Sequence, residues 1–196
     1  MLLALSGVQL GGILPIAIFP DVLPFHIIMG LVFIGTANVF IYDVAITEHY
    51  KWIGLFWYRF WRIPYALKYI LSETKAWFHR GPQPVDPRLY DTKKKDYIEK
   101  LIPSVIMVFW MFVILGSVLA FTGLALAFPS TFWFVYAVWN PIGYVTVGVT
   151  GLPLMLAIHR LATYLLVSLV LMHIYAVFLF KLVRSMIDGN EKVRAV

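Results

Sequence analysis

Two histidines lie inside one of the most apolar stretches of the chain, HRLATYLLVSLVLMH at residues 159 to 173. His159 and His173 are 14 residues apart. At ~100° and ~1.5 Å per residue, this separation returns a helix to within ~40° of its starting direction and advances it by ~21 Å. The spacing predicts two imidazoles on one stripe of a single helix, at two depths. Imidazoles bind metals, and an ionisable group within an apolar span is a functional candidate by default.

A third histidine, His26 in PFHIIMG, lies near the beginning of another apolar stretch. If the two stretches cross a membrane in the same direction, His26 and His159 lie at the same depth, toward the outer side. Zinc is disfavoured because no third or fourth ligand is expected at that depth. Heme b needs only two axial imidazoles and an apolar slot between helices, so we interpret His26 and His159 as heme ligands. The alternative is that these histidines hydrogen-bond to neighbouring helices or to water.

Two further residues fit the same interpretation. Gly30 follows His26 by about one helical turn, which suits the close approach of a flat macrocycle, although ordinary helix packing also uses glycine there. Arg160 is the only Lys or Arg deep within an apolar stretch, and its guanidinium suits a heme propionate. The alternative for Arg160 is that its side chain reaches the outer headgroups.

Composition predicts the elements that position these residues. The 196-residue chain is 61% hydrophobic and 13% charged, which is far more apolar than a soluble domain. It has no cysteine, which excludes disulfides and cysteine-held metal clusters within this chain. Since ~20 helical residues cross a ~30 Å hydrocarbon core, we predict an all-α integral membrane protein, one domain over residues 1–196. Its four transmembrane helices would form a heme-binding bundle from the apolar segments 2–19, 23–42, 101–128 and 153–182, of which the first is marginal.

The placement of positive charge predicts the orientation. Eleven of the 16 Lys and Arg residues lie between Lys51 and Lys100, and four more lie at or after the end of the fourth segment. By the positive-inside rule, the 44–100 segment and both termini are expected to be cytoplasmic. The 44–100 segment mixes aromatic and basic residues, which predicts amphipathic helix at the headgroup level, broken at Pro64. We interpret His49 and His79, which belong to it, as ordinary surface histidines.

The opposite connection, PSTFWFVYAVWNPIGYVTVGVTGLP, carries no Lys or Arg. It is rich in aromatic residues and contains Gly and Pro. Trp and Tyr concentrate at membrane–water interfaces, so we expect an external connection that rests in the interface.

Several motifs resemble those of the membrane cytochrome b (gamma) subunits of respiratory formate dehydrogenases and nickel–iron hydrogenases. The most specific is HRLATYLLVSLVLMHIYAVFLFKLVRSMIDG at 159–189. Weaker ones are ALSGVQL at 4–10, PFHIIMG at 24–30 and LYDTKKK at 89–95. The similarity covers essentially the whole chain.

The resemblance implies a multi-pass subunit in the cell membrane of a prokaryote, with two stacked b hemes. His26 and His159 would hold the outer heme, and His173 would hold the inner heme together with a histidine at the start of span one. A quinone would bind at the inner side, near positions that match Tyr90, Asp91 and His173. Electrons would come from an iron–sulfur subunit and a catalytic dehydrogenase or hydrogenase subunit. This chain would have no dehydrogenase chemistry of its own.

The sequence departs from the family pattern at its beginning, because no histidine precedes His26. We expect that the N-terminus is incomplete; the alternatives are another ligand for the inner heme, or no inner heme. A second function class therefore stays open. The chain would then be a structural membrane anchor of a redox complex, carrying one heme at His26 and His159 or none.

Overall fold

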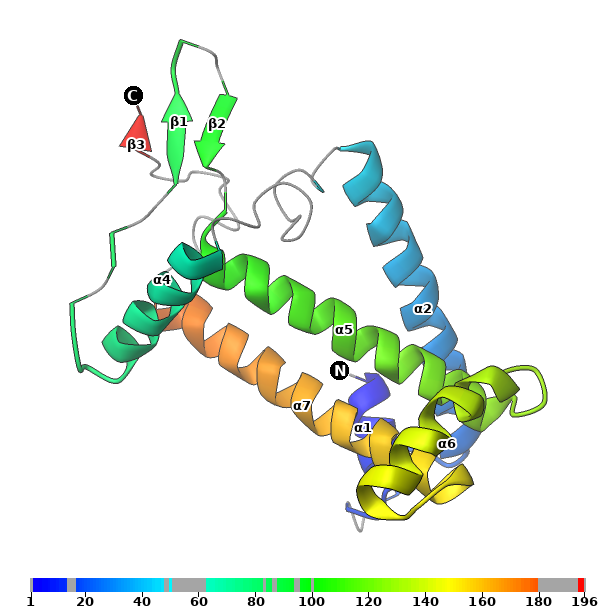
Figure 1. Ribbon diagram of the computed structural model, residues 1–196. Coiled ribbons are helices and arrows are strands. Elements are labelled where there is room, and N and C mark those ends of the chain that lie inside the picture. Colours follow the sequence, from blue (N-terminus) through cyan, green and yellow to red (C-terminus); the bar gives the residue numbers. More distant parts are fainter. Residues whose placement is uncertain are drawn as a thin grey trace. The chain divides into compact units, whose positions relative to one another are not determined.

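The structure is a computed structural model, labelled along the chain in Figure 1. It describes a large part of the sequence, and for the strand residues it describes the backbone alone. The predictions made for His49, and for the chain between Leu179 and Arg194, concern residues outside this description. The described residues are 2–13, 17–47, 50, 63–82, 84–85, 88–93, 96–99, 101–179 and 194–195.

The chain divides into two compact units, which are described separately below. The first comprises Met1–Tyr42 and Phe112–Leu171, and the second comprises Asp43–Met111 and Met172–Val196.

Among the described residues, three helices are long and apolar enough to cross a membrane. They are α2 (Val22–Ile46), α5 (Pro103–Ala127) and α7 (Gly151–Leu179). Their bounds differ from the predicted segments by a few residues at each end. Within the described part of the chain, this confirms three of the four predicted spans as long apolar helices.

The first predicted span is shorter than expected. Helix α1 covers Leu2–Leu10, nine residues, which is ~14 Å of helix against a ~30 Å hydrocarbon core. The helix ends at the Gly11–Gly12 pair, where Gly12 has φ of 70°, a conformation that glycine adopts without a Cβ clash. The Gln9 side chain then holds the following residues, since it donates to the Phe19 carbonyl and accepts from the N–H groups of Ile18 and Phe19.

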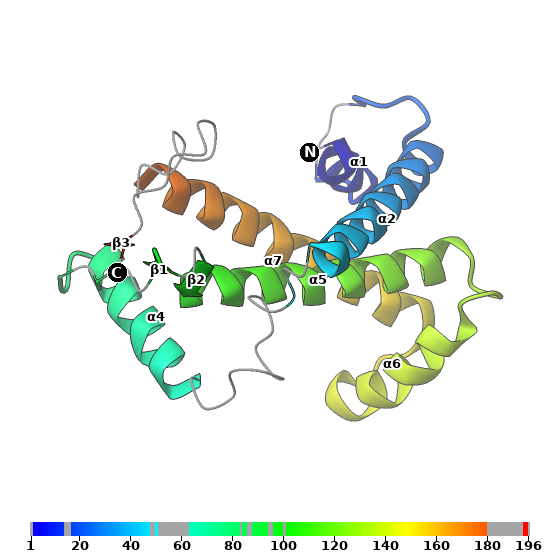
Figure 2. The same cartoon turned by 90° about the horizontal axis from the view of Figure 1, so that it is seen from above.

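The aromatic connection after α5 contains a helix that sequence reasoning did not predict. Helix α6 spans Trp133–Val147 and ends at Gly148, which has φ of 69°. Figures 1 and 2 both show α6 beside the adjoining ends of α5 and α7. The contact is a small core of Ala125, Val135 and Met155, one residue from each helix.

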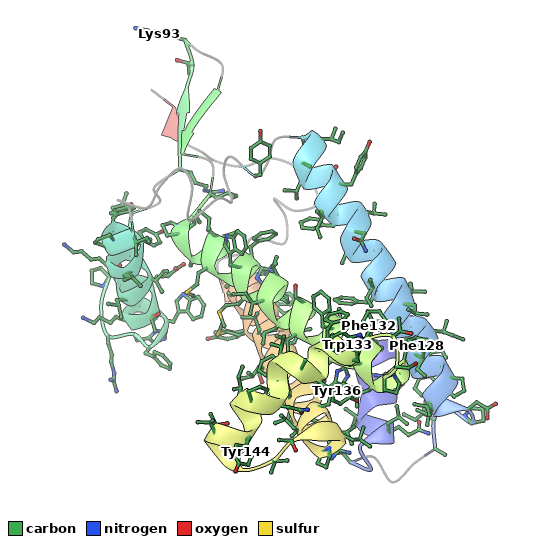
Figure 3. The ribbon with its side chains drawn as sticks, turned by 45° about the vertical axis from the view of Figure 1, so that its right-hand side comes forward. Lys93, Phe128, Phe132, Trp133, Tyr136 and Tyr144 are labelled. Carbon is green, nitrogen blue, oxygen red and sulfur yellow. The ribbon has the colours of Figure 1, made fainter. Side chains whose placement is uncertain are left out.

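Aromatic residues surround this core. Phe132, Tyr136 and Trp139 pack against it, and the Tyr136 hydroxyl donates to the Ala125 carbonyl. Figure 3 shows Phe128, Phe132 and Trp133 close together where α5 leads into α6, with Tyr144 at the far end of α6. The Asn140 side chain accepts from the Gly151 N–H, so that α6 caps the first turn of α7. These contacts fix the beginning of the helix that carries His159.

The second unit contains helix α4 (Ile63–Trp77). Pro64 lies in the first turn of this helix, where the missing N–H of proline costs no helical hydrogen bond. The stretch just before Ile63, which the predicted break at Pro64 also concerns, lies outside the described residues. Tyr69 and Glu73, one turn apart, are buried. Whether α4 lies at the headgroup level stays a prediction.

A small sheet, which the sequence did not predict, accompanies the helices. Strands β1 (Leu89–Asp91) and β2 (Asp96–Glu99) pair antiparallel, and β3 (Arg194–Ala195) pairs parallel with β1, giving the order β2-β1-β3. Lys93 lies at the tip of the β1–β2 hairpin in Figure 3. The strands are two to four residues long, too short to show a periodic hydrophobic pattern in the sequence.

Candidate functional site

The first unit brings two imidazoles together. His26 lies on the second turn of α2, and His159 lies on the third turn of α7. Their ring centroids are 6.3 Å apart, with an angle of 79° between the ring planes. Both side chains are half-buried. Two helices that are far apart in the sequence thus bring one imidazole each close to the other.

The separation of the rings suits one metal ion between them. Imidazole–metal bonds are ~2 Å long and the ligating nitrogen lies ~1 Å from the ring centre, so two imidazoles on opposite sides of one ion have centres ~6 Å apart. The observed 6.3 Å agrees with this separation. No group of three or more His, Cys, Asp or Glu side chains suited to a metal ion occurs among the described residues. A two-imidazole site of this kind fits heme, whose porphyrin supplies the other iron ligands.

His26 is held by two consecutive residues of α1. The Ser6 hydroxyl oxygen lies 2.9 Å from Nδ1 of His26, and this hydroxyl is fully buried. The next residue, Gly7, lies against the ring edge: a Cβ added there would stand 3.2 Å from Cε1 of His26. These contacts leave Nε2 as the nitrogen that can face a metal.

His159 is held in the same way by two consecutive residues of α5. The Thr122 hydroxyl oxygen lies 2.9 Å from Nδ1 of His159, and Thr122 is fully buried. A Cβ added at Gly123 would stand 3.3 Å from Cε1 of His159. Each imidazole therefore contacts a hydroxyl residue and the glycine that follows it, on α1 for His26 and on α5 for His159. The two sets of contacts are nearly equivalent.

The sequence also proposed Gly30 and Arg160 as neighbours of the cofactor. A Cβ added at Gly30 would meet nothing within 4 Å, so this glycine borders open space. Arg160 follows His159 on α7 and its side chain is exposed. A role for either residue toward a heme stays a prediction.

The other predicted site residues belong to the second unit. His173 lies on α7 and is exposed. Tyr90 and Asp91 lie in β1, next to one another in the pairing with β2. Their side chains are outside the described part of the structure, so the predicted quinone site is untested. His79 is exposed, as expected of a surface histidine; its φ of 56° places it in the left-handed region just after α4.

The second unit also buries an acid. Burial raises the pKa of the Glu73 carboxyl on α4 above its ordinary value, and a hydrogen bond with the Ser104 hydroxyl, in the first turn of α5, opposes this rise by a smaller amount. The carboxyl is outside the three long apolar helices. Its protonation therefore makes the stability of the folded chain depend on pH.

Sequence reasoning missed the residues that hold the imidazoles. The sequence does contain a pattern at both places: Ser6–Gly7 and Thr122–Gly123 are each a hydroxyl residue followed by glycine within an apolar segment. Such pairs are frequent in membrane helices, where small residues serve close packing. Only the folded arrangement shows that each pair faces a histidine.

Comparison with known protein families identifies the chain. Residues 1–189 match the family described as prokaryotic cytochrome b561. The chain belongs to the prokaryotic cytochrome b561 family. No curated protein and no solved structure matched the chain. The family assignment confirms the resemblance to membrane cytochrome b subunits, including those of nickel–iron hydrogenases.

Membership of the cytochrome b561 family defines the function in outline. The protein is a membrane subunit that binds heme b and transfers electrons, and it works with a partner in a redox complex. The long apolar helices of this cytochrome b561 protein agree with a location in the membrane.

Proposed function

We propose that His26 and His159 are the axial ligands of one heme b. The observation that carries the proposal is the 6.3 Å separation of their ring centres, which matches two imidazoles on opposite sides of one iron. The hydrogen bonds at Nδ1 of both rings support it, because they leave Nε2 of each ring for the iron.

The bound heme supplies the redox chemistry, the uptake and release of one electron at iron. The residues of the chain hold and surround it. His26 and His159 would hold the macrocycle, and the open space at Gly30 would give it room. Arg160, the residue after His159, is exposed, and its guanidinium would pair with a propionate.

The wider proposal is a di-heme subunit that passes electrons across the membrane to a quinone. His173 would hold a second heme ~21 Å further along the helix axis than His159. A quinone would bind near Tyr90, Asp91 and His173, and an iron–sulfur subunit, with a catalytic dehydrogenase or hydrogenase subunit, would deliver the electrons. The family match over residues 1–189 supports one functional domain that uses the whole chain.

The topology that accompanies this proposal has four spans. Helices α2, α5 and α7 would supply three of them, and the fourth is the span predicted over residues 2–19, which contains the nine-residue α1. The concentration of Lys and Arg between Lys51 and Lys100 supports a cytoplasmic location for this segment and for both termini of the protein in a prokaryotic cell membrane.

The second candidate is a membrane anchor with a single heme. The observation that favours it is that the structure brings His26 and His159 together, while His173 is exposed on α7. His173 would then be a structural or quinone-binding residue.

The heme-to-protein ratio of the purified chain separates the candidates. We expect His26→Ala and His159→Ala each to lose the same heme, whereas His79→Ala, the matched control at an exposed histidine, keeps the wild-type content. Two hemes per chain, one of them lost in His173→Ala, support the di-heme subunit. One heme that survives His173→Ala supports the anchor. Full heme content in His26→Ala contradicts the proposed ligand pair.

A further inference from the structure

The hydroxyls of Ser6 and Thr122 each make a second hydrogen bond. The Ser6 hydroxyl lies 3.0 Å from the Leu3 carbonyl oxygen on α1. The Thr122 hydroxyl lies 2.6 Å from the Val118 carbonyl oxygen on α5. Both partners are backbone carbonyls, which accept hydrogen bonds and never donate them.

This second bond determines where the proton of each imidazole lies. A hydroxyl has one hydrogen, and in both cases it is donated to the backbone carbonyl. The hydroxyl oxygen can then only accept from the imidazole, so Nδ1 of His26 and Nδ1 of His159 carry hydrogens. In a neutral imidazole with a protonated Nδ1, Nε2 has the free lone pair. Nε2 is the nitrogen that binds a metal in this tautomer.

We propose that Ser6 and Thr122 are positioning residues that hold His26 and His159 in the Nδ1–H tautomer and thereby set their strength as heme ligands. The inference rests on the proposed function, since it assumes that these two imidazoles are the axial pair. It adds two hydroxyl residues from helices α1 and α5 to a site whose ligands come from α2 and α7.

The chemical consequence is a change in the electron density at the iron. A hydrogen bond from Nδ1–H to an acceptor raises the basicity of a ligating histidine and fixes the ring orientation. A more basic ligand favours ferric over ferrous iron and lowers the reduction potential. Loss of an outer-shell partner typically costs ~10- to 100-fold in metal affinity.

The test compares Thr122→Val with Thr122→Ser in the full chain, loaded with heme in detergent or nanodiscs. Valine keeps the shape of threonine and removes the hydroxyl, whereas serine keeps the hydroxyl. We expect Thr122→Val to raise the reduction potential of the heme and to speed heme loss to a scavenging protein by ~10-fold or more. Thr122→Ser should restore both values. Ser6→Ala and Ser6→Thr form the equivalent pair at His26.

Two measurements make the test specific. Thr36→Val on α2 is the control, because among the described residues the Thr36 hydroxyl bonds to the Val32 carbonyl alone, and so its loss should change neither value. Proton NMR of the reduced, diamagnetic heme protein, labelled with nitrogen isotope at histidine, observes the Nδ1–H hydrogens directly. Exchange-protected Nδ1–H signals in wild type that lose protection in Thr122→Val and Ser6→Ala support the proposal.

The outcomes separate this inference from the proposed function. If His26→Ala and His159→Ala remove the heme while Thr122→Val and Ser6→Ala keep wild-type potential, heme retention and NMR signals, the inference is wrong and the axial pair stands. If His26→Ala keeps the full wild-type heme content, both the axial pair and the inference are wrong.

Discussion

Gly123 on α5 lies directly against the imidazole of His159 on α7, so close that a Cβ at this position would stand 3.3 Å from Cε1 of the ring. This distance is tighter than most real Cβ contacts, and the imidazole would have to give way by a few tenths of an ångström. The preceding residue, Thr122, hydrogen-bonds to the same ring. The Gly123 backbone and the Thr122 hydroxyl together therefore fix the position of the His159 imidazole.

Gly123→Ala should consequently displace His159 and weaken heme binding. We expect broader or shifted low-spin signals in the electron paramagnetic resonance spectrum, together with faster heme loss, because axial ligation depends on ring orientation. Gly35→Ala is the matched control, since a Cβ at Gly35 meets nothing within 4 Å. A spectrum of Gly123→Ala identical to that of wild type would contradict the seating described for His159.

Gly30→Ala tests whether the open space beside this glycine is used by a macrocycle. In the heme-free chain the added methyl has room, so thermal stability should be unchanged or slightly higher, because alanine is the better helix former. In the heme-loaded chain we expect lower heme retention, because the methyl intrudes on the face of the ring. Equal heme retention in Gly30→Ala and Gly35→Ala would remove Gly30 from the cofactor site.

Gly143→Ala tests the turn that fixes the beginning of α7. Gly143 is buried in α6, and an added Cβ would clash with the Leu154 side chain and the Val149 carbonyl. Overpacking of this kind costs ~1–3 kcal/mol. We expect a lower thermal unfolding midpoint in detergent for Gly143→Ala, with heme loss as a secondary effect. Unchanged stability would mean that α6 and α7 do not pack through this glycine.

The Glu73 carboxyl should make the stability of the folded chain depend on pH. Burial raises its pKa, so the folded chain binds the proton more tightly than the unfolded chain, in which glutamate titrates near ~4.3. Stability should therefore fall as pH rises from ~4.3 to the higher pKa of the folded state, and level off beyond it. Glu73→Gln should remove this decrease, as measured by thermal unfolding across the pH range.

Ser104→Ala provides the complementary test of the same carboxyl. Its hydroxyl bonds to Glu73 and lowers the pKa, which means that it favours the ionised form. Without it the pKa rises further, and the loss of stability should extend to higher pH. A pH profile of Glu73→Gln that overlays that of wild type would show that this carboxyl does not control the dependence.

The sequence by itself determined the long apolar helices and the ligand candidates. Helices α2, α5 and α7 follow from apolar runs longer than a bilayer core requires, a property that each run carries alone. The pairing of His26 with His159 followed from their positions near the beginnings of two such runs. Local sequence was a weaker guide to two other helices. The apolar run at the beginning of the chain predicted a longer helix than α1, which ends at a glycine pair. The aromatic residues of α6 predicted a connection in the membrane interface and no helix.

Tertiary structure alone decided what surrounds the histidines. Ser6 is 20 residues from His26 along the chain, and Thr122 is 37 residues from His159. No periodicity links residues so far apart, because the contact depends on how helices pack and rotate. The same reason applies to Gly7 and Gly123, which read as ordinary small residues until the fold sets each of them against an imidazole.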